Sequence, residues 1–355
     1  MARLTRAETQ ERNRAKVLTA ARAEFAERGF RDAKIDGIAE RAELTRGAVY
    51  SNFPGKRALY FAVLADAADH APEVHHEPGT TVREALGALA RAWVGALPMA
   101  TDSAHGDARL GVDLLPEIMA DELTRRPFAQ LLSLDAIVLG LALERLDPSA
   151  GRLVRVAEAA LTTLHGASGL AAAAPGFGEI FNVVRACEQL ADLDLGDRWP
   201  APTLVPPVHA VDQPWTPTSA IDLLTGDPAV LDGDGVVAVL GVHRLTAVEE
   251  ALRAGADVTA VVVTGHPEEL SPLVRLTVTE LRTRLRQAVP RSAWPRLRIV
   301  DDDRGFLAAA AGVPAVDADT ETVVRVSAGR VVARADGYGA CHAAARRSPT
   351  AVEQA

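Results

Sequence analysis

Residues 34–60, KIDGIAERAELTRGAVYSNFPGKRALY, decide how the N-terminal part of the chain folds. The apolar residues of this stretch fall at helical spacing in two short segments, near residues 34–41 and 45–52: Ile35, Ile38, Ala39, Leu44 and Val49. This spacing predicts two short helices packed at a steep angle, as in a helix-turn-helix. A longer amphipathic helix from about residue 6 to 29 precedes them, and Pro54-Gly55 marks a turn before the next helix.

Helical geometry predicts which residues of the second short helix face outward. If Val49 points into the core, Gly47 and Ser51 lie on the opposite side, with Arg46 and Tyr50 beside them. A glycine inside a helix costs ~1 kcal/mol relative to alanine. Gly47 therefore indicates that the helix backbone approaches another molecule closely, such as the floor of a DNA groove.

A capping residue and two cations complete this candidate surface. Thr45 is the natural N-cap of the second helix, and Arg46 is placed to hydrogen-bond a base edge or a phosphate. Lys56 follows the Pro-Gly turn at the start of the next helix, where its ammonium and the free backbone N–H groups would clamp a phosphate. Two short helices of an ordinary bundle with solvated charges remain the alternative interpretation.

Residues 7–64 resemble the TetR family of transcriptional regulators. The resemblance rests on the long first helix and on a series of spaced residues: Gly29-Phe30, Ile38-Ala39, Gly47, Tyr50, Phe53, Lys56 and Leu59. It implies a homodimer that binds an operator in double-stranded DNA and responds to a small-molecule effector. It also implies that Thr45, Arg46, Gly47 and Ser51 face the major groove, while Tyr50 and Lys56 bind phosphates.

Two positions depart from the family pattern. Lys34 stands where the family often has Thr or Ser, so a charged phosphate contact would replace one from a hydroxyl group. Asn52 stands where the family often has His, which changes little in this interpretation.

The charge distribution favours the same partner. The 355 residues carry a net charge of −9, but residues 1–60 contain 13 Lys and Arg against 8 Asp and Glu. A basic segment of +5 on a body of −14 attracts DNA at one surface and repels it elsewhere. The charged N-terminus has no signal-peptide core, and the sequence lacks an apolar run of membrane-spanning length, so we expect a cytoplasmic protein without a membrane partner.

Composition divides the rest of the chain. Helical patterns continue to about residue 195, seven prolines follow between Pro200 and Pro228, and β-rich runs such as VVAVLGV then alternate with helices. We expect an all-α N-terminal part followed by an α/β domain, in five parts: 1–62 DNA-binding helix-turn-helix, 63–195 helical ligand-binding and dimerisation domain, 196–232 Pro-rich connector and start of the C-terminal domain, 233–345 α/β domain, and 346–355 tail.

The helical part offers a dimer face and pocket candidates. Small residues permit close helix approach at Ala159, Gly166, Gly169 and Ala173, and the family resemblance makes the last two helices a four-helix bundle in the dimer, with intramolecular core as the alternative. We therefore expect residues 1–195 to suffice for a dimer.

Candidate pocket residues are Trp93, Met99, Met119 and Phe128, each also suited to plain core. His70, His75 and His76 lie near a loop without carboxylate or thiol partners at ligand spacing, so we predict no metal site and no cofactor.

The C-terminal segment resembles a thioredoxin-like domain, in particular the redox-inactive one of flavin-dependent aromatic hydroxylases. Val313-Pro314 occupies the place of that fold's cis-proline, and RVVARADGYGA resembles its terminal strand pair. Where a redox member carries cysteines, this chain has His243, Arg244 and Thr246. An unrelated small α/β domain is the alternative.

The function classes follow from these patterns. We predict a ligand-responsive repressor and not an enzyme, because the sequence lacks a Ser/His/Asp order, a phosphate-binding glycine loop and paired cysteines. The two cysteines, Cys187 and Cys341, are expected to be buried or incidental. The alternatives are a partner-binding or dimerising role for the C-terminal domain, or a transfer or redox activity there.

Overall fold

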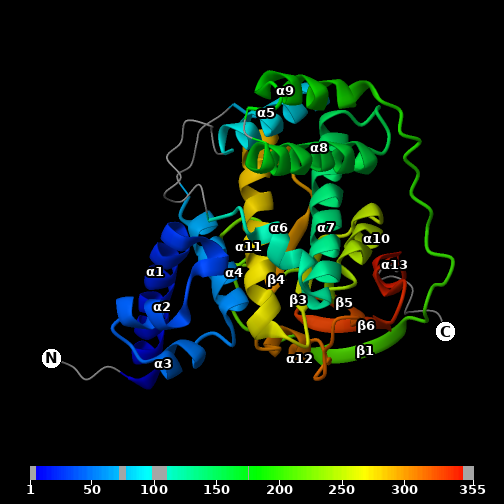
Figure 1. The fold of residues 1–355 in the computed structure, drawn as a ribbon. Helices are drawn as coiled ribbons and strands as arrows, with labels where there is room; N and C mark the ends of the chain where they lie inside the picture. The colour runs from blue at the N-terminus through cyan, green and yellow to red at the C-terminus, as the bar shows by residue number, and fades with distance from the viewer. Residues whose placement is uncertain (1–4, 72–76, 98–109, 175, 347–355) are drawn as a thin grey trace, which may run out of the picture.

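Three helices form the N-terminal part of the protein, which we call the head (Figure 1): α1 (Arg6–Asp32), α2 (Ile35–Arg41) and α3 (Arg46–Tyr50). The computed structural model describes residues 5–71, 77–97, 110–174 and 176–346. Thr5 and Glu8 form a capping box at the start of α1. Gly29 has a positive φ of 72°, so α1 bends near the predicted stop and continues to Asp32.

In the described part of the chain, six helices follow the head before the sheet: α4 (Lys56–Asp69), α5 (Val82–Gly95), α6 (Leu114–Met119), α7 (Glu122–Leu146), α8 (Val154–Ala173) and α9 (Ile180–Gln189). The last two lie across the end of the bundle that is farthest from α3 (Figure 1). Among the described residues, α7 is the one helix long and apolar enough to span a membrane, and 67% of its apolar window is buried inside the protein.

A six-stranded sheet forms the second half of the chain, with strands β1 (His209–Pro214), β2 (Gly235–Gly241), β3 (Val258–Val263), β4 (Leu297–Asp301), β5 (Glu321–Ser327) and β6 (Arg330–Asp336). The strand order is β1-β6-β5-β2-β3-β4. Strands β2, β3 and β4 are parallel, whereas β5, β6 and β1 pair antiparallel. The segment predicted as a connector thus supplies the edge strand β1. The associated helices are α10 (Val248–Arg253), α11 (Pro267–Ala288), α12 (Phe306–Ala310) and α13 (Ala340–Arg346).

The two faces of the sheet pack against different partners. Along β2, the side chains of Val236, Ala238 and Leu240 join the main core, while Val237 and Val239 join a smaller cluster on the other face. The smaller cluster is completed by α12, and the main core continues without interruption into the helical half. The hydrophobic core therefore does not stop at the boundary predicted near residue 195.

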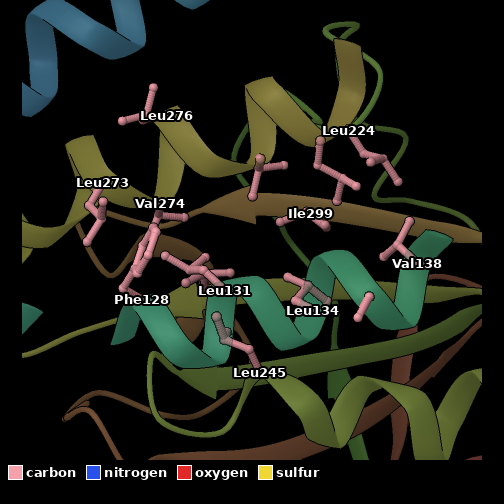
Figure 2. Packing of buried hydrophobic residues seen from close by; sticks show 14 of the residues in the cluster. Phe128, Leu131, Leu134, Val138, Leu224, Leu245, Leu273, Val274, Leu276 and Ile299 are labelled. Carbon is pink, nitrogen blue, oxygen red and sulfur yellow. The ribbon is translucent and has the colours of Figure 1, made fainter. Parts of the chain in front are cut away.

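Helix α11 makes extensive contacts with both halves. It packs against α4, α5 and α7 as well as against β4 (Figure 1). Figure 2 shows Leu273 and Val274 of α11 next to Phe128 and Leu131 of α7, while Leu276 points away from α7. The sheet and the helical bundle thus both pack against α11.

Several predicted residues have different environments from those expected. Met119 is 73% exposed at the end of α6, whereas Phe128 lies in the core beside α11. Met99, His75 and His76 lie outside the described residues, and His70 is exposed. The Val313–Pro314 bond is trans and precedes β5 by several residues. Both cysteines are buried.

Candidate nucleic-acid interface

The head is built around a small apolar core from all three of its helices. Val17 and Phe25 of α1, Ile38 of α2 and Val49 of α3 are at most 1% exposed. Glu24 of α1 is also buried. Its carboxylate is 3.1 Å from Arg28 and 3.0 Å from Arg41, so it ties α1 to α2 and fixes the position from which α3 projects.

Helix α3 presents the predicted residues outward. Thr45 is its N-cap and accepts a hydrogen bond from the backbone N–H of Ala48. Because Val49 is turned into the core, the residues around it on the helix surface are exposed: Thr45, Arg46, Gly47, Tyr50 and Ser51. We call these five residues the reading surface.

Arg46 has neighbours on this surface that sequence reasoning missed. Its guanidinium lies 3.4 Å from the Asp36 carboxylate and 5.6 Å from the centre of the Tyr50 ring. A hydrogen bond with Tyr50 and the charge of Asp36 raise the pKa of Arg46. An exposed ion pair is worth little, so a phosphate or a guanine base can replace Asp36 as the partner of Arg46. The acid in the first turn of α2 was the signal available in the sequence.

Gly47 has no internal reason to be a glycine within the described part of the chain. A Cβ atom there would meet one neighbour, the Thr45 Oγ1 atom at 3.9 Å, and the residue has an ordinary helical backbone. Space for a side chain therefore exists at this exposed position. This fits the close approach to a groove floor predicted from the sequence.

The two lysines of the predicted surface differ in their freedom. Lys34 is exposed at the N-cap of α2 and its side chain makes no capping bond. Lys56 is half-buried: its ammonium donates to the Arg31 carbonyl at 3.1 Å and lies 4.6 Å above the Phe30 ring. Burial lowers the pKa of Lys56. The predicted phosphate clamp therefore requires Lys56 to exchange this internal contact for a phosphate.

The turn after α3 is fixed by a residue that the sequence reasoning did not select. Arg14 of α1 donates to the Asn52 carbonyl at 3.3 Å and lies 4.4 Å above the Phe53 ring. This contact holds the chain between α3 and α4 against α1. A lone arginine on the polar side of a long helix gave no signal of this role.

Comparison with known proteins places this segment in a family. Residues 17–63 match the bacterial regulatory proteins of the tetR family. TtgW of Pseudomonas putida, an uncharacterized HTH-type transcriptional regulator, is 36% identical over 105 residues, which cover 30% of this chain and 72% of TtgW. The chain belongs to the tetR family. The HTH-type transcriptional regulator SrpR of Pseudomonas putida is 36% identical over 105 residues, which cover 45% of SrpR and 30% of this chain.

The tetR match contains every residue of the reading surface together with Lys34 and Lys56. It ends at residue 63, inside α4, whereas the sheet begins at β1 more than 140 residues later. The two relatives match over 105 residues, which is longer than this segment and less than a third of the chain. Among the described residues, no group of three or more His, Cys, Asp or Glu side chains is arranged to hold a metal ion.

Proposed function

We propose that this protein is a sequence-specific DNA-binding transcriptional regulator that acts as a homodimeric, ligand-responsive repressor. The observation that carries the DNA-binding part is the reading surface, five exposed residues on a short helix that projects from a basic, well-packed head. Arg46 would contact a base edge in the major groove, and Lys34, Tyr50 and Lys56 would contact phosphates.

The exposed surface of α8 and α9 supports the homodimer. Gly166, Gly169 and Ala173 are not buried on α8, and Phe177 and Phe181 are 70% and 73% exposed in the following turn and on α9. Exposed aromatic side chains beside a row of small residues are typical of a surface that another helix covers. A second copy packed through α8 and α9 would form a four-helix bundle and hold two heads for successive major grooves, ~34–36 Å apart.

Repression and its release by a small molecule rest on the family resemblance. An effector that entered the helical part would change the spacing of the two heads and so release the operator. Among the candidate pocket residues, Trp93 carries a polar N–H group that is held by a hydrogen bond: its indole donates to Ser168 at 2.8 Å, and its ring lies edge-on to His165. We also propose that this regulator is cytoplasmic, as expected from the sequence.

The C-terminal half fits a non-catalytic role. The order β6-β5-β2-β3, with a parallel β2–β3 pair and an antiparallel β5–β6 hairpin, supports the proposed thioredoxin-like fold. The position that carries a reactive thiol in redox members is occupied by His243 and Arg244, which pair with Asp319 and Glu321. Burial raises the pKa of Cys341 well above that of an ordinary thiol, so it is a poor nucleophile.

The test uses DNA selected from a random duplex pool by the full-length protein. Arg46→Ala should weaken binding to the selected DNA by a factor that corresponds to ~1–3 kcal/mol, with little effect on unrelated DNA. Lys56→Ala should weaken binding to all sequences and reduce the salt dependence by about one unit. Arg330→Ala removes the same charge from the strand β6 and serves as the matched control. Parental affinity in both head variants would contradict the proposed reading surface.

A further inference from the structure

Helix α4, which leaves the head, is enclosed on all sides over about two turns. Seven successive residues, from Ala58 to Leu64, are buried. A helix is buried around its whole circumference only when neighbours cover every side. Helix α1 of the head covers one side of α4, and α11 of the C-terminal half covers another with the most extensive helix–helix contact in the protein. The C-terminal half therefore touches the head's exit helix directly.

Ion pairs hold α4 to α11 near both ends. Arg57 lies 3.0 Å from Glu269, and Asp69 lies 2.5 Å from Arg282. The two pairs are separated by 12 residues on α4 and 13 on α11, which at 1.5 Å per residue is roughly 18–20 Å on each helix. The helices thus run side by side in the same direction over this length. Arg57 also lies 2.7 Å from Asp121 at the start of α7.

The same helix is anchored on its other sides. Arg284 of α11 lies 3.3 Å from the buried Asp135 of α7 and 4.0 Å above the Trp93 ring of α5. Arg275 of α11 lies 2.7 Å from Asp301 at the end of β4. Of the 22 residues of α11, two are exposed, Glu268 and Arg286. A displacement of the sheet relative to the bundle must therefore displace α11, and α4 with it.

We propose that the C-terminal α/β half sets the position of the head through the α4–α11 contact, which makes this half the control domain of the regulator. None of the reading-surface residues belongs to this contact, so it governs where the reading surface is held and not what that surface recognises. A molecule that bound the sheet half and shifted α11 would change DNA affinity without touching the head. This proposal goes beyond the proposed DNA-binding function. It rests on that function for one of its two tests, which measures DNA affinity, whereas the other measures amide hydrogen exchange.

The test reverses charges in the pair Asp69–Arg282. Asp69→Arg and Arg282→Asp each place like charges together, whereas the double variant restores an opposite pair. We expect each single variant to bind the selected DNA roughly fivefold or more weakly than the parent. The double variant should return to within about twofold. The neutral variants Asp69→Asn and Glu269→Gln should also bind the selected DNA more weakly than the parent, but by a smaller factor. They replace the charge reversals in the test if a reversed variant fails to fold.

The control applies the same reversals to Asp212 and Arg330, an ion pair between the strands β1 and β6. These variants change the net charge equally and should keep parental DNA affinity. The second readout is amide hydrogen exchange in residues 35–50, which do not contain either member of the reversed pair. Exchange there should become faster in the single Asp69 and Arg282 variants and return to the parental rate in the double variant.

The two readouts separate the proposals. If the parent selects DNA, the affinities of the variants for that DNA test the proposal. Single charge reversals that bind like the parent, or a double variant whose affinity is not restored, would overturn control through α11. If the parent selects no DNA, the DNA-binding function fails, and exchange decides the coupling. Unchanged exchange in residues 35–50 of both single variants then overturns it.

Discussion

Replacing Gly140 and Gly166 with alanine, one at a time, should change stability in opposite directions. Both glycines lie inside long helices, α7 and α8, where alanine is favoured by ~1 kcal/mol. At Gly140 the new Cβ would lie 2.6 Å from the Val154 Cα atom and 2.9 Å from its nitrogen, so the backbone at the start of α8 must move. Overpacking of this kind costs ~1–3 kcal/mol. The expected net effect of Gly140→Ala is a loss of up to about 2 kcal/mol.

Gly166 is the matched site without that clash. No atom of the described residues lies within 4 Å of its Cβ position, so Gly166→Ala should stabilise an isolated subunit by up to ~1 kcal/mol. If α8 meets α8 or α9 of a second copy there, the methyl group overpacks the interface, and the dimer dissociation constant should rise roughly tenfold.

The assay for this pair combines urea unfolding, followed by circular dichroism, with sedimentation equilibrium of the same samples. A Gly140→Ala protein as stable as the parent would refute the close approach of α7 and α8. A Gly166→Ala protein that gains stability and keeps the parental dissociation constant would show that the proposed dimer face lies elsewhere.

Three further outcomes follow from single side chains. Tyr60→Phe removes a buried hydrogen bond to the Leu110 carbonyl and should cost about 1–2 kcal/mol in urea unfolding, whereas parental stability would argue against that contact. Burial, with repulsion from Glu321, raises the pKa of Glu250 from its ordinary 4.5 to about 6, so the stability gained from its protonation is complete below pH 4.5 and lost as the pH rises through 6. Because Glu250 is only half-buried, we expect the free energy of unfolding of the parent to fall by about 1 kcal/mol across that pH window, and Glu250→Gln to abolish this decrease. A variant with the parental pH profile would contradict this. The full-length protein should neither reduce insulin nor consume peroxide, and turnover that Cys341→Ser abolishes would contradict the non-catalytic interpretation.

The head could be predicted from the sequence because its signals are local. The Thr45 cap and the inward direction of Val49 each depend on neighbours within a few residues, and the structure has both. At Gly29, where the sequence predicts the end of the first helix, α1 bends and continues to Asp32. The internal contact of Lys56 was not predictable in the same way. Its partner is the carbonyl of Arg31, a backbone atom 25 residues earlier, and no side-chain pattern marks such a group.

The packing partners of α11 could not be predicted from the sequence for a different reason. Periodicity shows that a helix has buried faces but not which element covers them. The run Ala58–Leu64 in α4 was the available signal, because an apolar run of two turns needs cover on more than the one side that α1 supplies. The change of composition at Gly196 suggested a domain boundary, yet composition reports the local chain and not the packing of residues that lie far apart along it.

The fragment of residues 1–195, expected from the family resemblance to suffice for a dimer, should therefore fail to fold as the intact protein does. It lacks α11, so one side of the otherwise enclosed α4 would face water, as would the apolar surface of α7 around Phe128 and Leu131. Burial of a single large apolar side chain is worth ~1.5–3 kcal/mol, so losing several exceeds the stability of a typical domain. We expect the fragment to aggregate or to bind a hydrophobic dye strongly, with little cooperative unfolding, whereas the full chain does neither. A soluble, cooperatively unfolding dimer of 1–195 would show that the helical half stands alone and that α11 only rests on it.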